Sequence, residues 1–151
     1  MFLSDTRCSP CIVNKRDATN MSALFFALER SDFPIIQLLM NFPGIEVNNR
    51  NDGGEFPLLY AIAKKPEAVR LFLSNPTTIL DCILSGTEEN VVNIACEQNS
   101  VDLLKMFMED KRWNPELINW RPREGHNDSA LSTAAKEGFT EIMKMLLDQP
   151  G

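Results

Sequence analysis

The sequence predicts an all-α solenoid built from repeated pairs of short helices. Three observations indicate this fold: an internal repeat, apolar residues at helical spacing inside each copy, and helix-start signals at matching places. The repeat is marked by Ala27, Ala61 and Ala95, which are separated by two intervals of 34 residues, and a fourth copy at Ala134 follows after 39. Such a period is typical of units that stack on their neighbours.

Each copy contains two apolar segments. The first segments, which contain these alanines, are residues 22–27, 56–61, 91–95 and 129–134. The second segments are residues 35–40, 68–73, 101–107 and 142–147. Apolar residues within them recur three to four positions apart, which predicts one buried face per helix. Each unit is therefore expected to run as helix, tight turn, helix and extended loop.

Helix-start signals agree with this order. Asp32 can cap a helix that contains Pro34, because its carboxylate can accept a hydrogen bond from a backbone N–H of the first turn. Pro66 is predicted to lie just inside the second helix of its unit, where its missing N–H removes no hydrogen bond.

A longer alignment extends the repeat to the start of the chain. Residues 1–16 align without gaps on residues 106–121, with Met, Phe, Asp, Arg, Pro, Asn and Arg identical in the two segments. We therefore expect a single domain that begins in a partial repeat and is a fragment of a longer array. The expected units are residues 1–13 (the partial repeat), 14–47, 48–81, 82–118 and 119–151.

The repeat resembles the ankyrin family. Residues 22–25, 56–59 and 129–132 are similar to the family's Thr-Pro-Leu-His, and residues 13–17 and 47–54 to its Val-Asn-x-x-Asp-x-x-Gly hairpin. Residues 136–139 resemble its turn between helices. The resemblance implies an ankyrin-repeat solenoid of four helix pairs with β-hairpin-like loops, preceded by the partial repeat.

The sequence also departs from the family pattern. The family's histidine, which ties adjacent turns together, is replaced in the four units by Phe25, Leu59, Asn93 and Ser132. The third hairpin, residues 79–86, has lost the Asn-Asp-Gly pattern, so we expect it to be irregular, with some helix. Losing these ties is expected to lower stability, because each repeat is supported only by its neighbours.

The resemblance implies a protein-interaction module that binds a peptide or a folded protein. In the family, partners lie on a concave surface formed by hairpin tips and first helices. The matching residues here are Lys15, Arg16, Glu29, Arg30, Arg50, Glu55, Lys64, Glu97, Gln98, Trp120, Arg121, Arg123, Lys136 and Glu137. Their charges alternate in sign, so no strongly acidic or basic partner is indicated. The alternative function is a structural spacer that positions another domain of a larger protein.

The fourth loop is lengthened, and its residues 113–128 leave two interpretations open. It contains both tryptophans, Trp113 and Trp120, together with Arg121, Arg123 and His126. Tryptophan and arginine dominate binding hot spots, which favours recognition of a partner. Buried aromatic residues usually serve packing, which is the preferred interpretation for Trp113. For Trp120 both interpretations stay open.

Composition excludes several other classes of function. A net charge of −6 argues against binding nucleic acid, and no apolar run reaches the roughly 18 residues of a membrane span. Without a secretory signal, the four cysteines are expected to be reduced thiols in the cytoplasm or nucleus. Cys8 and Cys11 have the spacing of half a zinc site, but no second pair of ligands matches them. We expect no metal, cofactor, small-molecule substrate or enzymatic activity; His126 is the only histidine.

Overall fold

The computed structural model describes residues 10–83, 88–121 and 128–149. The chain divides into two compact units, Met1–Thr78 and Ile79–Gly151. Within the described residues, the regular structure consists of short α-helices, two 3-10 helices and isolated β-bridges. This confirms the predicted all-α fold.

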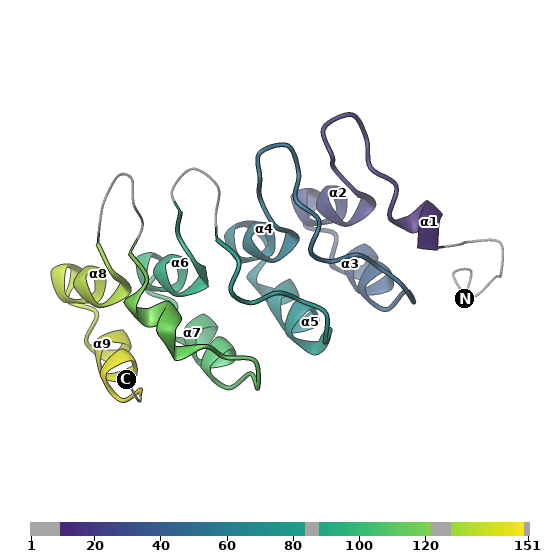
Figure 1. The fold of residues 1–151 in the computed structure, drawn as a ribbon. Coiled ribbons are helices and arrows are strands. Elements are labelled where there is room, and N and C mark those ends of the chain that lie inside the picture. Colours follow the sequence, from purple (N-terminus) through teal and green to yellow (C-terminus); the bar gives the residue numbers. More distant parts are fainter. Residues whose placement is uncertain (1–9, 84–87, 122–127, 150–151) are drawn as a thin grey trace. The chain divides into compact units, whose positions relative to one another are not determined.

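Unit 1 contains two complete helix pairs. They are α2 (Ala23–Arg30) with α3 (Phe33–Met40), and α4 (Pro57–Lys64) with η1 (Pro66–Ala68) and α5 (Val69–Ser74). The short helix α1 (Pro10–Val13) precedes them. Helix α2 lies beside α4 and α3 beside α5, so like helices stack on like (Figure 1).

Unit 2 repeats the arrangement. Its pairs are α6 (Val91–Glu97) with α7 (Val101–Met108), and α8 (Ala130–Glu137) with α9 (Thr140–Leu147), with η2 (Pro115–Asn119) between them. Helix α6 lies beside α8 and α7 beside α9 (Figure 1). The four predicted helix pairs are therefore present among the described residues. The sequence did not predict η2, but α1, an α-helical turn among the described residues, occupies the position aligned with it.

The core lies between the stacked helices. Phe25, Phe72 and Phe107 are among the largest fully buried side chains. Phe25 and Leu59 stand where the family has its histidine, and they are 0% and 2% exposed, respectively. Apolar packing thus replaces the polar tie in unit 1. Helices of about eight residues are unstable alone, so this burial maintains them.

One helix start agrees with the sequence and one differs. The Asp32 carboxylate accepts a hydrogen bond from the backbone N–H of Ile35 at 3.2 Å, which confirms the predicted cap. Pro66 begins a 3-10 turn rather than the first turn of an α-helix, and α5 starts only at Val69. The residue before a proline is forced out of the α region, and 3-10 turns are common where helices begin.

In unit 1, asparagines connect each hairpin to the loop after the next helix pair. The Asn14 side-chain amide donates to the carbonyl of Gly44 at 2.7 Å, and its oxygen accepts from Glu46 N–H at 2.9 Å. Asn48, 34 residues later, donates in the same way to the carbonyl of Thr77 at 2.6 Å. These bonds hold successive repeats of unit 1 in register. The first loop is closed by an antiparallel bridge between Arg16 and Ser22.

Unit 2 uses a different asparagine. Cys82 stands at the position of Asn14 and Asn48 and is buried. The fully buried Asn90 caps α6 by accepting from the backbone N–H groups of residues 92 and 93, at 2.8 and 3.1 Å. Its amide donates to the carbonyl of Leu117 at 2.9 Å. One side chain therefore starts α6 and fixes the next loop.

The third loop is irregular where the structure describes it. Residues 79–83 form bends and an isolated bridge between Ile83 and Asn90, with no helical turn, while residues 84–86 lie outside the described segments. The helix expected here is therefore not found in the described part of the loop. The bridge to the buried Asn90, and not a local turn sequence, sets the path of this loop.

The turn between the two helices of a pair has a residue with left-handed backbone conformation in three of the four repeats. Ser31, Asn99 and Gly138 occupy the same repeat position, with φ of 56°, 49° and 75°. Lys65 is at this position in the remaining unit, with φ of −147°. A left-handed conformation is costly for residues with a Cβ atom and costs glycine little.

We therefore predict that Ser31→Gly raises the free energy of unfolding by about 0.5–1 kcal/mol, because it relieves backbone strain. The matched change Lys65→Gly is predicted to lower it by about the same amount, since flexibility is added where no strain is present. Urea denaturation of the two variants measures both values. Equal effects of the two substitutions would contradict the argument.

A second prediction concerns Asn90. Asn90→Ala removes a helix cap and leaves the Leu117 carbonyl without this donor, so we expect the free energy of unfolding to fall by about 2–4 kcal/mol. Ser129 caps α8 with one side-chain bond to the Ser132 N–H, at 3.2 Å. Ser129→Ala is the control and is expected to cost about 1 kcal/mol. If Asn90→Ala costs no more than the control in urea denaturation, the bond to Leu117 contributes little.

Candidate functional site

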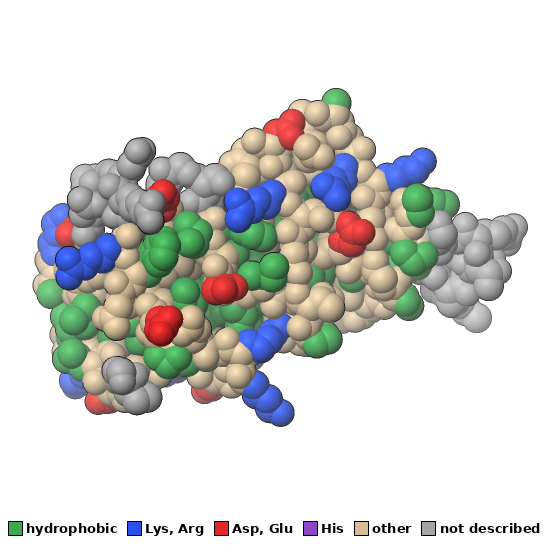
Figure 2. All heavy atoms as spheres, in the orientation of Figure 1, with side chains coloured by type: hydrophobic (Ala, Val, Ile, Leu, Met, Phe, Trp, Pro, Cys, Tyr) green, Lys and Arg blue, Asp and Glu red, His purple; other side chains and the backbone are tan. Residues whose placement is uncertain are grey.

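The predicted residues of the first helices share one exposed side. In each pair the first helix buries one face against the second helix and its stacked neighbour, and the positions two and three residues after the repeat alanine remain outside. The exposed predicted residues there are Glu29, Arg30, Lys64, Glu97, Gln98, Lys136 and Glu137. Basic and acidic side chains are interspersed on the face of each unit shown in Figure 2.

Most of the predicted hairpin residues of unit 1 contact residues of their own loop or of the next loop. Arg16 forms an ion pair with Glu46, with 3.7 Å between Nη2 and Oε2. The Arg50 guanidinium lies 4.3 Å above the centre of the Phe56 ring. Glu55 is half-buried and accepts a hydrogen bond from a neighbouring asparagine amide at 2.9 Å. Lys15 is exposed. These contacts pre-order the hairpins.

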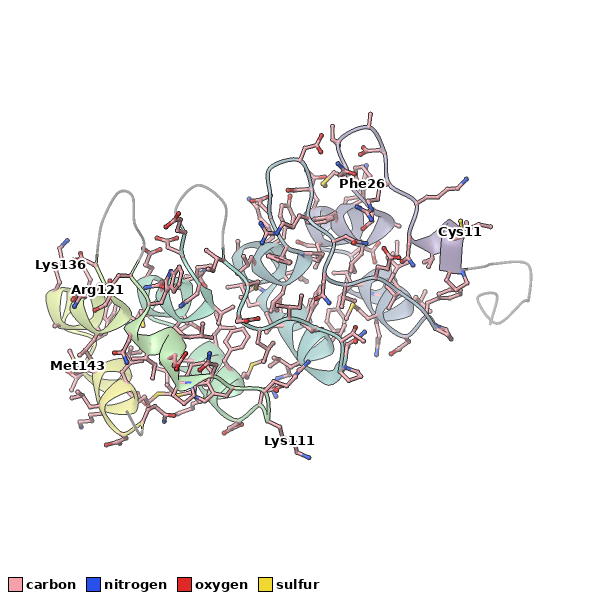
Figure 3. All side chains as sticks on the ribbon, viewed as in Figure 1. Cys11, Phe26, Lys111, Arg121, Lys136 and Met143 are labelled. Carbon is pink, nitrogen blue, oxygen red and sulfur yellow. The ribbon has the colours of Figure 1, made fainter. Side chains whose placement is uncertain are left out.

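Two aromatic residues of unit 1 join this surface and were not predicted. Phe26 is 42% exposed on α2, three and four residues before Glu29 and Arg30, so the three share one side of the helix (Figure 3). Tyr60, 34 residues later, is half-buried and packs edge-on against Phe25 with ring centres 5.7 Å apart. Their spacing by one repeat, just after the histidine position, is the signal that could have found them.

The Tyr60 hydroxyl lies near two carboxylates of the same surface. Burial, together with the negative charges of Glu29 and Glu55, raises the pKa of Tyr60 above its usual value. The hydroxyl therefore stays protonated near neutral pH and can donate a hydrogen bond.

The enlarged fourth loop is described only in part. Trp120 is half-buried, and its indole N–H donates to the carbonyl of Glu88 at 2.7 Å. Arg121 follows it and is exposed (Figure 3). The Trp113 indole nitrogen is buried and has no hydrogen-bond acceptor among the described residues. The predicted Arg123, and His126, lie outside the described residues. A hydrogen bond from Trp120 thus joins the fourth loop to the segment just before α6.

A cavity of about 230 Å³ lies between α6 and α8 in unit 2. One wall is formed by Glu89, Asn93 and Glu97, which are spaced by four and lie along one side of α6 and its approach. The other wall is formed by Asp128 and by Thr133, Lys136 and Glu137 of α8. Sequence reasoning named Glu97, Lys136 and Glu137 but not the residues that complete the walls.

Most of the charged residues that the structure describes around the cavity are acidic. The pKa of Glu97 is raised to about 7 by three effects: the partial burial of its carboxyl group, a hydrogen bond with Glu89 and the negative charge of Glu89. The Glu97 carboxyl group therefore loses its proton only close to neutral pH. Across the cavity, Lys136 Nζ lies 3.4 Å from Asp128 Oδ2 (Lys136 is labelled in Figure 3).

Within the described segments, no three or more His, Cys, Asp or Glu residues are placed to hold a metal ion. Cys11 is exposed and Cys96 is buried, and burial raises the pKa of the Cys96 thiol to about 12. Cys8 lies outside the described residues. No described helix has both the length and the apolar character needed to cross a membrane.

Comparison with known proteins identifies the fold. No protein-family model matches the chain, and no curated protein sequence matches it. Among solved structures, the ankyrin repeat protein EF0377 superposes with a TM-score of 0.69 at 22% identity, over 98% of this chain and 89% of that protein.

Two further structures agree. The ankyrin repeat domain of Bcl-3, a member of the IkappaB family, matches with a TM-score of 0.71 at 22% identity, over 93% of this chain and 59% of that domain. An ankyrin repeat domain from Acinetobacter baumannii AYE matches with a TM-score of 0.67 at 19% identity, over 89% of this chain and 67% of that domain. Together with the stacked helix pairs, these matches show that the chain has the ankyrin-repeat fold.

Proposed function

We propose that the chain is a protein-interaction module whose partner contacts the exposed side of the first helices and the hairpin tips. One observation carries the proposal. The positions two and three residues after the repeat alanine are exposed in every repeat and differ in chemistry between repeats, whereas the alanine itself is buried in each. The exposed residues are Glu29 and Arg30, Ala63 and Lys64, Glu97 and Gln98, and Lys136 and Glu137. Repeat scaffolds present extended surfaces of this kind for binding.

In unit 1, Phe26 is the proposed anchor of the interaction. An exposed aromatic ring surrounded by charged groups can be covered by a partner, and burying it contributes apolar area while the charges select the orientation. Glu29 and Arg30 supply one charge of each sign on the same helix side. Tyr60 adds a hydroxyl donor from the neighbouring helix.

Selection of peptides from a random display library against the full chain tests the function. We expect enriched peptides whose affinity falls at least about tenfold in Phe26→Ala, since hot-spot residues cost about 1.4 kcal/mol or more. Leu38→Ala is the control, because Leu38 is 54% exposed but lies on the second helix of the same pair. Its affinity is expected to stay within a factor of two or so of the original.

Circular dichroism verifies that both variants fold. Failure to enrich any peptide would favour the structural spacer over the interaction module. If Phe26→Ala and Leu38→Ala weaken peptide affinity equally, the first helices are not the binding surface.

For Trp120 we propose positioning rather than contact with the partner. Its indole N–H is already used by the Glu88 carbonyl, and its ring is half-buried. The side chain therefore sets the path of the loop that carries Arg121.

Trp120→Phe keeps an aromatic ring and removes the donor. We expect the free energy of unfolding to fall by about 1–2 kcal/mol, because the hydrogen bond from the indole to the Glu88 carbonyl is lost. Peptide affinity is expected to change little. Thermal denaturation and peptide titration of the same preparation separate the effects. Unchanged stability with lost affinity would show that Trp120 contacts the partner.

A further inference from the structure

We propose that unit 1 binds an arginine side chain of its protein partner between the carboxylates of Glu29 and Glu55, against the ring of Tyr60. The inference rests on the proposed interaction function and names the chemistry of the partner in unit 1. Glu29 belongs to α2 and Tyr60 to α4, while Glu55 lies in the hairpin that leads into α4. We call these three residues the unit 1 patch.

The packing of α2 against α4 brings the three residues of the patch together. Tyr60 packs edge-on against Phe25, with 5.7 Å between the ring centres, and Glu29 follows Phe25 by one helical turn. Tyr60 therefore lies beside the part of α2 that carries Glu29. Glu55 immediately precedes the N-cap residue of α4, so it lies at the end of the helix from which Tyr60 projects. Burial and the negative charges of both glutamates raise the pKa of Tyr60, which agrees with this placement.

Both carboxylates of the patch can accept further hydrogen bonds. Glu29 is exposed, and Glu55 is half-buried. Within the part of the chain that the structure describes, neither of them forms an ion pair. Glu55 uses its Oε2 atom, which accepts from the side-chain amide of Asn51 at 2.9 Å. The other carboxylate oxygens are therefore open to donors from a partner, and a charged donor bonds to them more strongly than a neutral one.

The nearby basic residues limit the partner to a single cation at this place. Arg30 and Lys64 are exposed on α2 and α4, and neither forms an ion pair with a carboxylate of the patch. Their positive charges repel a basic tract, because exposed charges act over about 8 Å at physiological salt. One arginine placed between the two carboxylates gains short-range hydrogen bonds that offset this repulsion.

The chemistry of the patch favours a guanidinium group over an ammonium group. A guanidinium presents its N–H donors in one plane, so it can bond to carboxylates from two elements while its face stacks on an aromatic ring. Unit 1 already contains such stacking, with the Arg50 guanidinium 4.3 Å above the centre of the Phe56 ring. Phe26 is 42% exposed at the same repeat position as Tyr60, and its ring adds apolar surface for the methylene stem (Figure 3).

The test is an NMR titration of the full chain with ¹³C in the tyrosine ring. Tyr60 is the only tyrosine of the sequence, so a single set of ring signals reports on the patch. The ligand is the acetylated, amidated tripeptide Gly-Arg-Gly at pH 7 and about 0.15 M salt, which screens distant charges. We expect a saturable shift with a dissociation constant of about 1–10 mM, as suits one anchored side chain.

Three further ligands test the chemistry. The citrulline tripeptide has nearly the same shape but no charge, and it is expected to give no saturable shift. The lysine tripeptide is expected to bind at least about threefold more weakly, because an ammonium group lacks the planar set of donors. Ca²⁺ is expected to leave the Tyr60 signals unchanged, since it takes roughly six to eight oxygen ligands.

Variants of the patch test the residues. Glu29→Gln and Glu55→Gln are each expected to weaken binding about three- to fivefold, the effect of losing one ion pair near the surface. The double variant is expected to give no saturable shift. Glu67→Gln is the matched control, because Glu67 is an exposed glutamate of unit 1 that lies in η1, outside the first helices and hairpins. Its dissociation constant is expected to stay within a factor of about two of the original.

Circular dichroism verifies that each variant folds. Equal binding of the citrulline or the lysine tripeptide, unchanged binding by the folded double variant, the same shift with Ca²⁺, or no saturable shift would each overturn the proposal. The titration needs no selected partner, so the two proposals can fail separately. If the selection enriches peptides but the titration fails, only the arginine site is rejected. If the selection fails and the titration succeeds, the arginine site stands and the interaction function is rejected.

Discussion

Burial of short helices against their neighbours is the interaction on which this structure depends. Helices such as α2 and α8 have eight residues each, too few to be stable in isolation. Each is maintained because its apolar side packs against the second helix of its pair and against the first helix of the adjacent pair. The side chains of Phe25, Phe72 and Phe107 are fully buried in these contacts. The opposite side of every first helix is consequently left exposed in each repeat.

Polar ties add register to this packing. Asn14 and Asn48 each bond to a loop about one repeat further along the chain, and Asn90 does the same in unit 2 while also capping α6. Such bonds contribute little net free energy when made, but they are costly to lose because they leave buried groups unpaired. They take over the role of the histidine tie that the sequence lacks. Asn93 stands at the third histidine position and lines the cavity of unit 2.

The two units offer different chemistry from equivalent positions. In unit 1 the exposed side of α2 combines an aromatic ring with charges of both signs, whereas in unit 2 the corresponding side of α6 faces an acidic hollow. Both features use the position two residues after the repeat alanine, occupied by Glu29 and Glu97. What surrounds that position differs, because loops of different length bring different residues beside it. A common backbone therefore presents distinct surface chemistry in different repeats.

The sequence by itself determined the period, the four helix pairs, the Asp32 cap and the exposed positions of the first helices, since these follow from apolar spacing within about 34 residues. It missed η2, the exposed Phe26 and the 3-10 start at Pro66. Only the tertiary structure decided that Asn90 reaches Leu117, that Trp120 donates to Glu88, and that Asp128 and Glu89 complete a cavity with Glu97 and Lys136. These contacts join residues about 8 to 47 positions apart through loops without a regular pattern. Periodicity specifies which side of a helix is buried, whereas loop path and side-chain direction specify which residues meet.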